Sequence, residues 1–133
     1  MTLRRMCRAK IHRATITQSR IDYEGSIEID EALMKAAGIL EHEMVLVANI
    51  ANGNRFETYV IKGKAGSGVI GLNGAAARLG SIGQKVIVMS VAWMDEAKAK
   101  KLKPLFIQVD GKNRLRAIRT GVDAKKRNAV SWN

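Results

Sequence analysis

The feature that most constrains this chain is a series of short β-type runs, with no helical pattern long enough to connect parallel strands. The runs are apolar or alternate between apolar and polar residues, and turn-forming residues separate them. They cover residues 6–20, 26–30, 44–50, 55–63, 67–72, 85–94 and 105–110. This pattern predicts a mainly β fold. We expect the strands to close into a small barrel, because closure leaves no unpaired strand edge.

Two short helices are expected between these strands. Residues 30–39 begin with Asp30, a favoured N-cap residue, and Gly38 stands where glycine commonly ends a helix. The second helical segment, "NGAAARLG" at residues 73–80, is long enough for one or two turns. Both helices are too short to carry the chain across a parallel sheet.

Two glycine-containing segments predict turns. Asn52-Gly53 is typical of a hairpin turn and lies between two of the predicted strands. "GSGVIG" at residues 66–71 matches the dinucleotide-binding pattern G-x-G-x-x-G. That pattern should end a strand and open a long helix, whereas here its last glycine lies in an apolar, strand-like run. We therefore interpret residues 66–71 as a glycine-rich hairpin and predict no nucleotide cofactor.

The positive charge is concentrated at the two ends of the chain. The formal net charge of +11 is divided as +6 over residues 1–20, −3 over residues 21–95 and +8 over residues 96–133. We predict no nucleic-acid partner, because aromatic residues for base stacking make up only 5% of the chain. We predict one domain over residues 1–116 and a basic, mobile tail over residues 117–133. A non-catalytic barrel that binds nucleic acid through its basic termini is the alternative function.

The cysteine and histidine residues suggest no metal or thiol chemistry. Cys7 is the single cysteine, so no disulfide can form within the chain, which fits a cytoplasmic setting. No signal peptide or membrane-spanning run is apparent. Cys7 and His12 are spaced wrongly for one strand face, which argues against a nucleophile–base pair. His12 and His42 form no metal-ligand pattern, so we predict no metal.

Gly25-Ser26 interrupts an otherwise strand-like segment, "IDYEGSIEID" at residues 21–30. One interpretation is a hairpin turn, because Gly-Ser is common in turns. The other is a site where the backbone itself reacts, since glycine permits a strained conformation and close approach of a hydroxyl group.

Other polar residues in the predicted strands could form a pocket with this segment. Lys10 and His12 are two residues apart and share one strand face. Arg55, Thr58 and Tyr59 lie on one short strand, with Tyr59 facing opposite to Thr58. The glycine and small side chains of "NGAAA" leave backbone N–H groups available to an anion at a helix start. Together these groups suit a small dicarboxylate or amino acid.

Four motifs in fixed order give the chain a family resemblance: "KIHRATIT" (10–17), "YEGSIEID" (23–30), "NGNRFETYVI" (52–61) and "NGAAARLGSIG" (73–83). From about residue 6 to residue 116 the chain resembles the aspartate 1-decarboxylase family, pyruvoyl-dependent enzymes that make β-alanine for pantothenate synthesis. The resemblance implies a six-stranded double-psi β-barrel with short helices, assembled as a homotetramer.

The resemblance also implies a role for the Gly25-Ser26 step. The Ser26 hydroxyl would attack the Gly25 carbonyl, and cleavage would give chains 1–25 and 26–133, with a covalent pyruvoyl group in place of Ser26. Thr58 matches the family residue that stabilises the oxyanion during processing. An accessory maturation factor is a further partner to test.

For the decarboxylation itself, the resemblance assigns L-aspartate as substrate. The substrate amine would form a Schiff base with the carbonyl derived from Ser26, an electron sink for decarboxylation. Lys10 and Arg55 would hold the carboxylates, and Tyr59 would donate a proton. The rest of the predicted substrate pocket consists of His12, Tyr23, Asn73, Gly74, Ala75 and Ala76.

Overall fold

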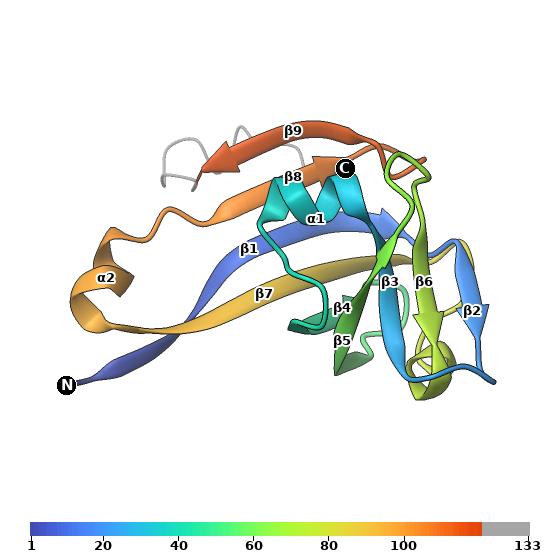
Figure 1. Ribbon diagram of the computed structural model, residues 1–133, viewed down its shortest axis with the longest axis horizontal. Helices are drawn as coiled ribbons and strands as arrows, with labels where there is room; N and C mark the ends of the chain where they lie inside the picture. Colours follow the sequence, from blue (N-terminus) through green and yellow to red (C-terminus); the bar gives the residue numbers. More distant parts are fainter. Residues whose placement is uncertain (121–133) are drawn as a thin grey trace.

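The structure is a computed structural model and describes residues 1–120 (Figure 1). In this part of the chain nine strands form one hydrogen-bonded sheet, accompanied by short helices. The mainly β fold predicted from the sequence is confirmed. The elements are β1 (Leu3–Thr15), β2 (Gln18–Arg20), β3 (Ser26–Asp30), α1 (Glu31–Ala37), β4 (Met44–Asn49), β5 (Arg55–Gly63), β6 (Ile70–Asn73), the 3₁₀ helix η1 (Gly74–Arg78), β7 (Lys85–Asp95), α2 (Glu96–Lys101), β8 (Leu105–Val109) and β9 (Leu115–Thr120).

The first strand closes the sheet into a barrel. β1 and β2 are two parts of one bent strand, separated by Ile16 and Thr17. The Ile16 N–H donates to the Gln84 carbonyl at 2.9 Å, next to β7, whereas the Thr17 N–H donates to the Ile70 carbonyl on β6 at 2.8 Å. The order β2-β6-β3-β5-β4-β7-β1 therefore returns to the strand on which it began. With β1 and β2 taken as one strand, and β8 and β9 set aside, the nine strands give a six-membered ring.

Two connections in this ring pass over a neighbouring strand. β2 and β3 follow each other in the chain but have β6 between them, and β5 and β6 follow each other but have β3 between them. Each arrangement is a ψ-loop, and the two together make the double-psi barrel. The hairpin predicted for residues 66–71 is therefore wrong. Gly66 and Gly68 have left-handed backbone and belong to the connection between β5 and β6, whereas Gly71 lies in β6. β5 and β6 pair with β3 and not with each other.

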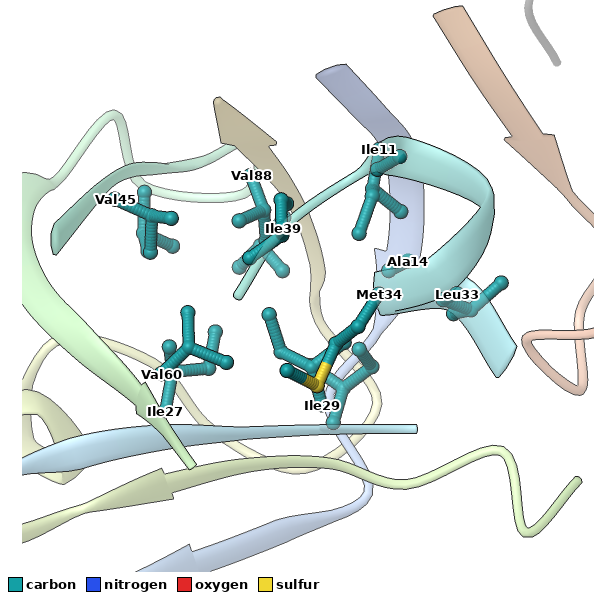
Figure 2. Close-up of a cluster of buried hydrophobic side chains, with 14 of the residues drawn as sticks. Ile11, Ala14, Ile27, Ile29, Leu33, Met34, Ile39, Val45, Val60 and Val88 are labelled. Carbon is teal, nitrogen blue, oxygen red and sulfur yellow. The ribbon is translucent and has the colours of Figure 1, made fainter. Parts of the chain in front are cut away.

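One apolar cluster fills the barrel (Figure 2). Ile27 on β3, Val60 on β5 and Val88 on β7 are completely buried, and Leu33 and Met34 join them from α1. Full burial of one such side chain contributes about 1.5–3 kcal/mol. On β3 and β5 this inward face alternates with an outward one, which fixes the direction of the remaining side chains.

The caps predicted for the first helix are confirmed. Asp30 accepts a hydrogen bond from the Ala32 N–H at 2.8 Å, and Gly38 ends α1 in the left-handed conformation with φ of 68°. The second predicted helix is a single 3₁₀ segment, η1. A further helix, α2, was not predicted because "EAKAKK" has no apolar stripe. It begins where the Asp95 side chain accepts from the Lys98 N–H at 2.8 Å.

The C-terminal part of the described chain is a hairpin of β8 and β9 on the outer edge of β1. β9 extends to Thr120, so residues 117–120, predicted to begin a mobile tail, are instead paired with β8. This strand was not predicted because most of its side chains are exposed and leave no apolar alternation. The rest of the predicted tail, residues 121–133, lies outside the described residues.

Candidate active site

The Gly25-Ser26 step lies where the connection from β2 enters β3. Ser26 is the first residue of β3 and is 1% exposed, whereas Gly25 is exposed. The Ser26 Oγ donates to the Glu24 carbonyl at 3.0 Å and accepts from Asn73 Nδ2 at 3.1 Å. Asn73 is buried and stands opposite Ser26 in the β3–β6 ladder. The hydroxyl is therefore held on both sides and turned back toward the residues that precede it.

Gly74 brings the start of η1 against the same segment. A Cβ atom on Gly74 would lie 2.7 Å from the backbone N and Cα atoms of Gly25 and 2.8 Å from the Tyr23 carbonyl oxygen. Gly74 also has φ of 67°, which glycine adopts without strain. Figure 1 shows η1 beside the start of β3. Backbone therefore packs on backbone at this point, and only glycine fits.

Strand alternation turns the site toward the outside of the barrel. Ile27 and Leu72 are opposite each other and completely buried, so the next pair, Ser26 and Asn73, faces outward. Tyr59 on β5 is half-buried and also lies on the outer face. The Ser26 hydroxyl is therefore buried, but it lies outside the apolar core of the barrel.

Thr58 points the other way, as expected. It is 9% exposed and shares the inward face of β5 with Val60. β3 and β5 are parallel, with Ile27 opposite Val60. If this register is continued two residues toward the N-terminal ends of both strands, Gly25 is opposite Thr58. The Thr58 hydroxyl thus belongs to the strand segment next to the Gly25 peptide.

Asn73 provides one more polar atom to the site. Its Oδ1 is buried and accepts no hydrogen bond within the part of the chain that the structure describes. A buried acceptor without a partner costs free energy, so such an atom is a good candidate to bind an N–H group. The arrangement thus combines a held hydroxyl, an adjacent peptide carbonyl and an open acceptor, which suits an acyl shift within the backbone.

Comparison with known families agrees with this geometry. Residues 1–116 match the family model described as aspartate decarboxylase. The chain belongs to the aspartate decarboxylase family.

Several curated relatives are named aspartate 1-decarboxylase. The protein from Pelotomaculum thermopropionicum is 56% identical over 116 residues, which cover 87% of this chain and 88% of that one. The protein from Dehalococcoides mccartyi is 51% identical over 120 residues, which cover 90% and 97% respectively. Among solved structures, the rationally designed protein mkDPBB_sym_86 is similar over 61% of this chain and 95% of its own, with 16% identity and a TM-score of 0.47.

The predicted pocket of this decarboxylase-family chain is divided between two parts of the ring. Lys10 and His12 lie on β1, whose partners at this level are β7 and β8, and the Lys10 Nζ lies 5.1 Å from the centre of the Phe106 ring. Arg55 is exposed at the first position of β5, the strand of Thr58. Within one chain, Ser26 therefore lies on a strand that pairs with β5 and β6, whereas Lys10 and His12 lie on the β1 part of the bent strand, which pairs with β7 and β8.

The remaining predicted pocket residues lie on the segments around Ser26. Ala75 and Ala76 belong to η1, where Ala75 is exposed and Ala76 is buried. Tyr23 precedes the Gly25-Ser26 step and is half-exposed, with its ring 5.9 Å from the Arg20 guanidinium carbon.

The sequence did not point to His42 as a neighbour of Tyr59. Its ring centre lies 6.1 Å from that of Tyr59, and its backbone is left-handed with φ of 72°. The His42 N–H donates to the Val60 carbonyl at 2.7 Å, which fixes this loop against β5. Nothing local in the sequence could show this contact, because it depends on where the loop after α1 meets a later strand.

The Cys7 thiol is partly buried on β1. Burial raises the pKa of the Cys7 thiol, although the nearby Lys10 charge, a backbone hydrogen bond at Ala9 and the Arg8 charge act in the opposite direction. A protonated thiol is a poor nucleophile. Within residues 1–120 no group of three or more metal-ligating side chains comes together. The helices found there are too short or too polar to cross a membrane.

Proposed function

We propose that this chain is a self-processing, pyruvoyl-dependent aspartate 1-decarboxylase that converts L-aspartate to β-alanine and carbon dioxide for pantothenate synthesis. One observation carries the proposal. In a chain of the aspartate decarboxylase family, the buried Ser26 hydroxyl is held between the Glu24 carbonyl and the Asn73 amide, beside the exposed Gly25.

Processing begins when Ser26 Oγ attacks the Gly25 carbonyl carbon. The C–N bond between the two residues breaks as the C–O bond forms, so an amide becomes an ester. Thr58 donates to the carbonyl oxygen while it carries negative charge. Elimination then breaks the bond between Ser26 Cβ and the ester oxygen and leaves a Gly25 carboxylate. One water hydrolyses the unsaturated residue that remains, which releases ammonia and gives a keto group at position 26.

The residues around position 26 fit a pyruvoyl group. Asn73 Nδ2 already donates to the Ser26 oxygen, and its buried Oδ1 accepts no hydrogen bond from residues 1–120. Gly74 lets the start of η1 lie directly against the Gly25 backbone, where a Cβ atom would collide. When formed, the group supplies an electron sink for the loss of a carboxylate.

The chain's own side chains bind the substrate and move the proton. Arg55 can hold one substrate carboxylate through two parallel hydrogen bonds, and Lys10 attracts the other. The Tyr59 phenol, on the outer face with Ser26, returns a proton to carbon after carbon dioxide leaves. The pocket is completed by His12, Tyr23, Asn73, Gly74, Ala75 and Ala76.

The division of the pocket supports a homotetramer. Ser26 and Asn73 face outward, and Lys10 and His12 lie on another part of the ring. Contact between two copies can bring these groups together, so we assign the complete pocket to a subunit interface. We also propose a cytoplasmic location, which the single Cys7 and the proposed metabolic role support.

Intact mass spectrometry tests the processing step. Purified protein should contain chains 1–25 and 26–133, the second without a free N-terminal amine. Ser26→Ala should give one folded, uncut chain that makes no β-alanine, because both the nucleophile and the precursor of the keto group are removed. Folded wild-type protein that stays uncut and inactive after prolonged warming would contradict the proposal.

Tyr59→Phe separates processing from turnover. The variant should be cut like the wild type, but its β-alanine production should fall by roughly a hundredfold or more, the usual contribution of a general acid. Turnover at the wild-type rate would remove Tyr59 from the role of proton donor.

A further inference from the structure

A basic hollow lies between β1, the start of β7 and the hairpin of β8 and β9. It has a volume of about 150 Å³ and is lined by Arg13, Lys85, Val109, Asp110, Gly111 and Arg116. We call it the Arg13 hollow. None of these residues takes part in the processing or decarboxylation proposed above.

The backbone of Arg13 is unusual. It has φ of 60°, in the left-handed region that residues other than glycine seldom adopt. It lies at a register shift between Ile11 and Ala14 in the β1–β7 ladder. Bulges of this kind redirect a side chain, and strained residues persist where the surroundings impose them. The fold therefore accepts strain at the position that supplies an arginine to the hollow.

The three cations of the hollow outnumber its one carboxylate, Asp110, and form no ion pair among residues 1–120. Within residues 1–120, no carboxylate lies within 4.0 Å of the charged groups of Arg13, Lys85 or Arg116. Lys85 Nζ donates instead to the Thr15 hydroxyl at 2.9 Å. Like charges around one hollow repel each other, and a bound anion would relieve that repulsion.

The single carboxylate of the hollow is already engaged. Asp110 accepts from the Arg114 N–H at 3.0 Å and the Lys112 N–H at 2.8 Å. These bonds, with the charges of Arg114 and Arg116, lower the pKa of Asp110. Its charge therefore stabilises the hairpin turn and leaves an excess of positive charge in the hollow.

The walls of the hollow are fixed in place. Asn113, in the hairpin turn, accepts from the Thr15 N–H at 2.7 Å and donates to the Thr15 carbonyl at 2.8 Å. A third hydrogen bond joins Asn113 Nδ2 to the Gly68 carbonyl at 2.7 Å. The hairpin is thus tied to β1, and a pre-organised site loses little freedom when a ligand binds.

We propose that the Arg13 hollow binds one phosphate group, as inorganic phosphate or as the end of a small phosphomonoester. Two guanidinium groups offer the forked donors that match phosphate oxygens, and Lys85 adds a third charge. The small volume favours a single tetrahedral group over a nucleic-acid strand.

Calorimetric titration of the full-length protein with inorganic phosphate, and separately with glycerol 3-phosphate, tests this site. Arg13→Gly removes a cation and suits the left-handed backbone, so it should fold. Arg116→Ala removes a second, exposed cation. Each should weaken phosphate binding by about tenfold or more, the effect of losing a charged hydrogen bond. The matched control is Arg114→Ala, which removes the same charge from the same hairpin outside the hollow and should bind like the wild type.

The possible results separate the two sources of phosphate from a failed proposal. Tighter binding of glycerol 3-phosphate supports a phosphomonoester, and equal or tighter binding of inorganic phosphate supports the free ion. Absence of saturable binding, or an equal loss in all three variants, would overturn the site. Binding of a DNA or RNA oligomer that depends on Arg13 and Arg116, without phosphate binding, would also overturn it in favour of a nucleic-acid surface. β-Alanine production should be unchanged in all three variants.

Discussion

The β3–β6 ladder and the β1–β7 ladder are both antiparallel, but only the β1–β7 ladder contains register shifts. Every residue of β6 is buried, and its ladder with β3 runs without a register shift from Ser26 to Ile29. β1 and β7 contain 13 and 11 residues, their ladder has two register shifts, and its outer end extends past the barrel toward α2 (Figure 1). The short, buried β3–β6 pair can hold a side chain in one precise position. The long β1–β7 pair, which we call the β1–β7 ribbon, tolerates bulges that redirect charged side chains.

Gly74→Ala should break the enclosed region most severely. The new Cβ atom would meet the Gly25 backbone, and alanine disfavours the left-handed conformation. We expect the free energy of unfolding to fall by about 3 kcal/mol and cleavage to stop. Urea denaturation and intact mass measure the two effects. Gly111→Ala is the control, because a Cβ atom there meets nothing within 4 Å. Equal behaviour of the two variants would show that the close packing at Gly74 is unimportant.

Arg8→Met tests the hydrogen bonds by which Arg8, on β1, holds the end of α1 and Ser90 on β7. The Arg8 guanidinium donates to the Ala37 and Gly38 carbonyls at 3.2 and 2.9 Å and to the Ser90 hydroxyl at 2.8 Å. Loss of these partners should lower the free energy of unfolding by about 1–3 kcal/mol, because acceptors at the end of α1 lose a charged donor. Arg5→Met removes only an exposed ion pair and should change it by less than about 1 kcal/mol. If the free energy of unfolding falls equally in both variants, the hydrogen bonds of Arg8 contribute nothing beyond the loss of one surface charge.

Asp110→Asn should have the smallest effect, and one that depends on pH. The folded pKa of Asp110 lies below its ordinary value of 3.8, so its ionised form stabilises the fold above that value. This contribution is lost as the pH falls through the lowered folded pKa. The difference in melting temperature between wild type and variant should therefore be present at neutral pH and disappear in strong acid. A difference that stays constant down to about pH 2 would mean that the charge has no part in it.

Local patterns predicted local structure well. β5 occupies the predicted residues 55–63, because its alternation and the Asn52-Gly53 turn are both short-range signals. The ends of α1 followed from Asp30 and Gly38 for the same reason. The hairpin predicted at residues 66–71 failed because a ψ-loop is defined by a third strand, β3, which lies far away in the sequence.

The sequence motifs could name the residues of the candidate site, but they could not predict how those residues lie relative to one another. The motifs identified Ser26 and Asn73, but their hydrogen bond depends on the pairing of β3 with β6. Strand alternation placed Lys10 and His12 on one face, and it could not show that this face lies on a different part of the ring. α2 and β9 were missed because exposed, charged segments leave little apolar pattern.

The bent strand made of β1 and β2 determines what the proposed cleavage would do to the sheet. It is an interior strand, with β7 along one edge and β8 and β6 as its further partners. A break between Gly25 and Ser26 would therefore expose no new edge, and the piece comprising residues 1–25 would stay locked in the sheet as in a split protein that complements itself. The two pieces should migrate together in native gels and separate only on denaturation. Maturation would then change how the chain is connected without changing which strands are neighbours.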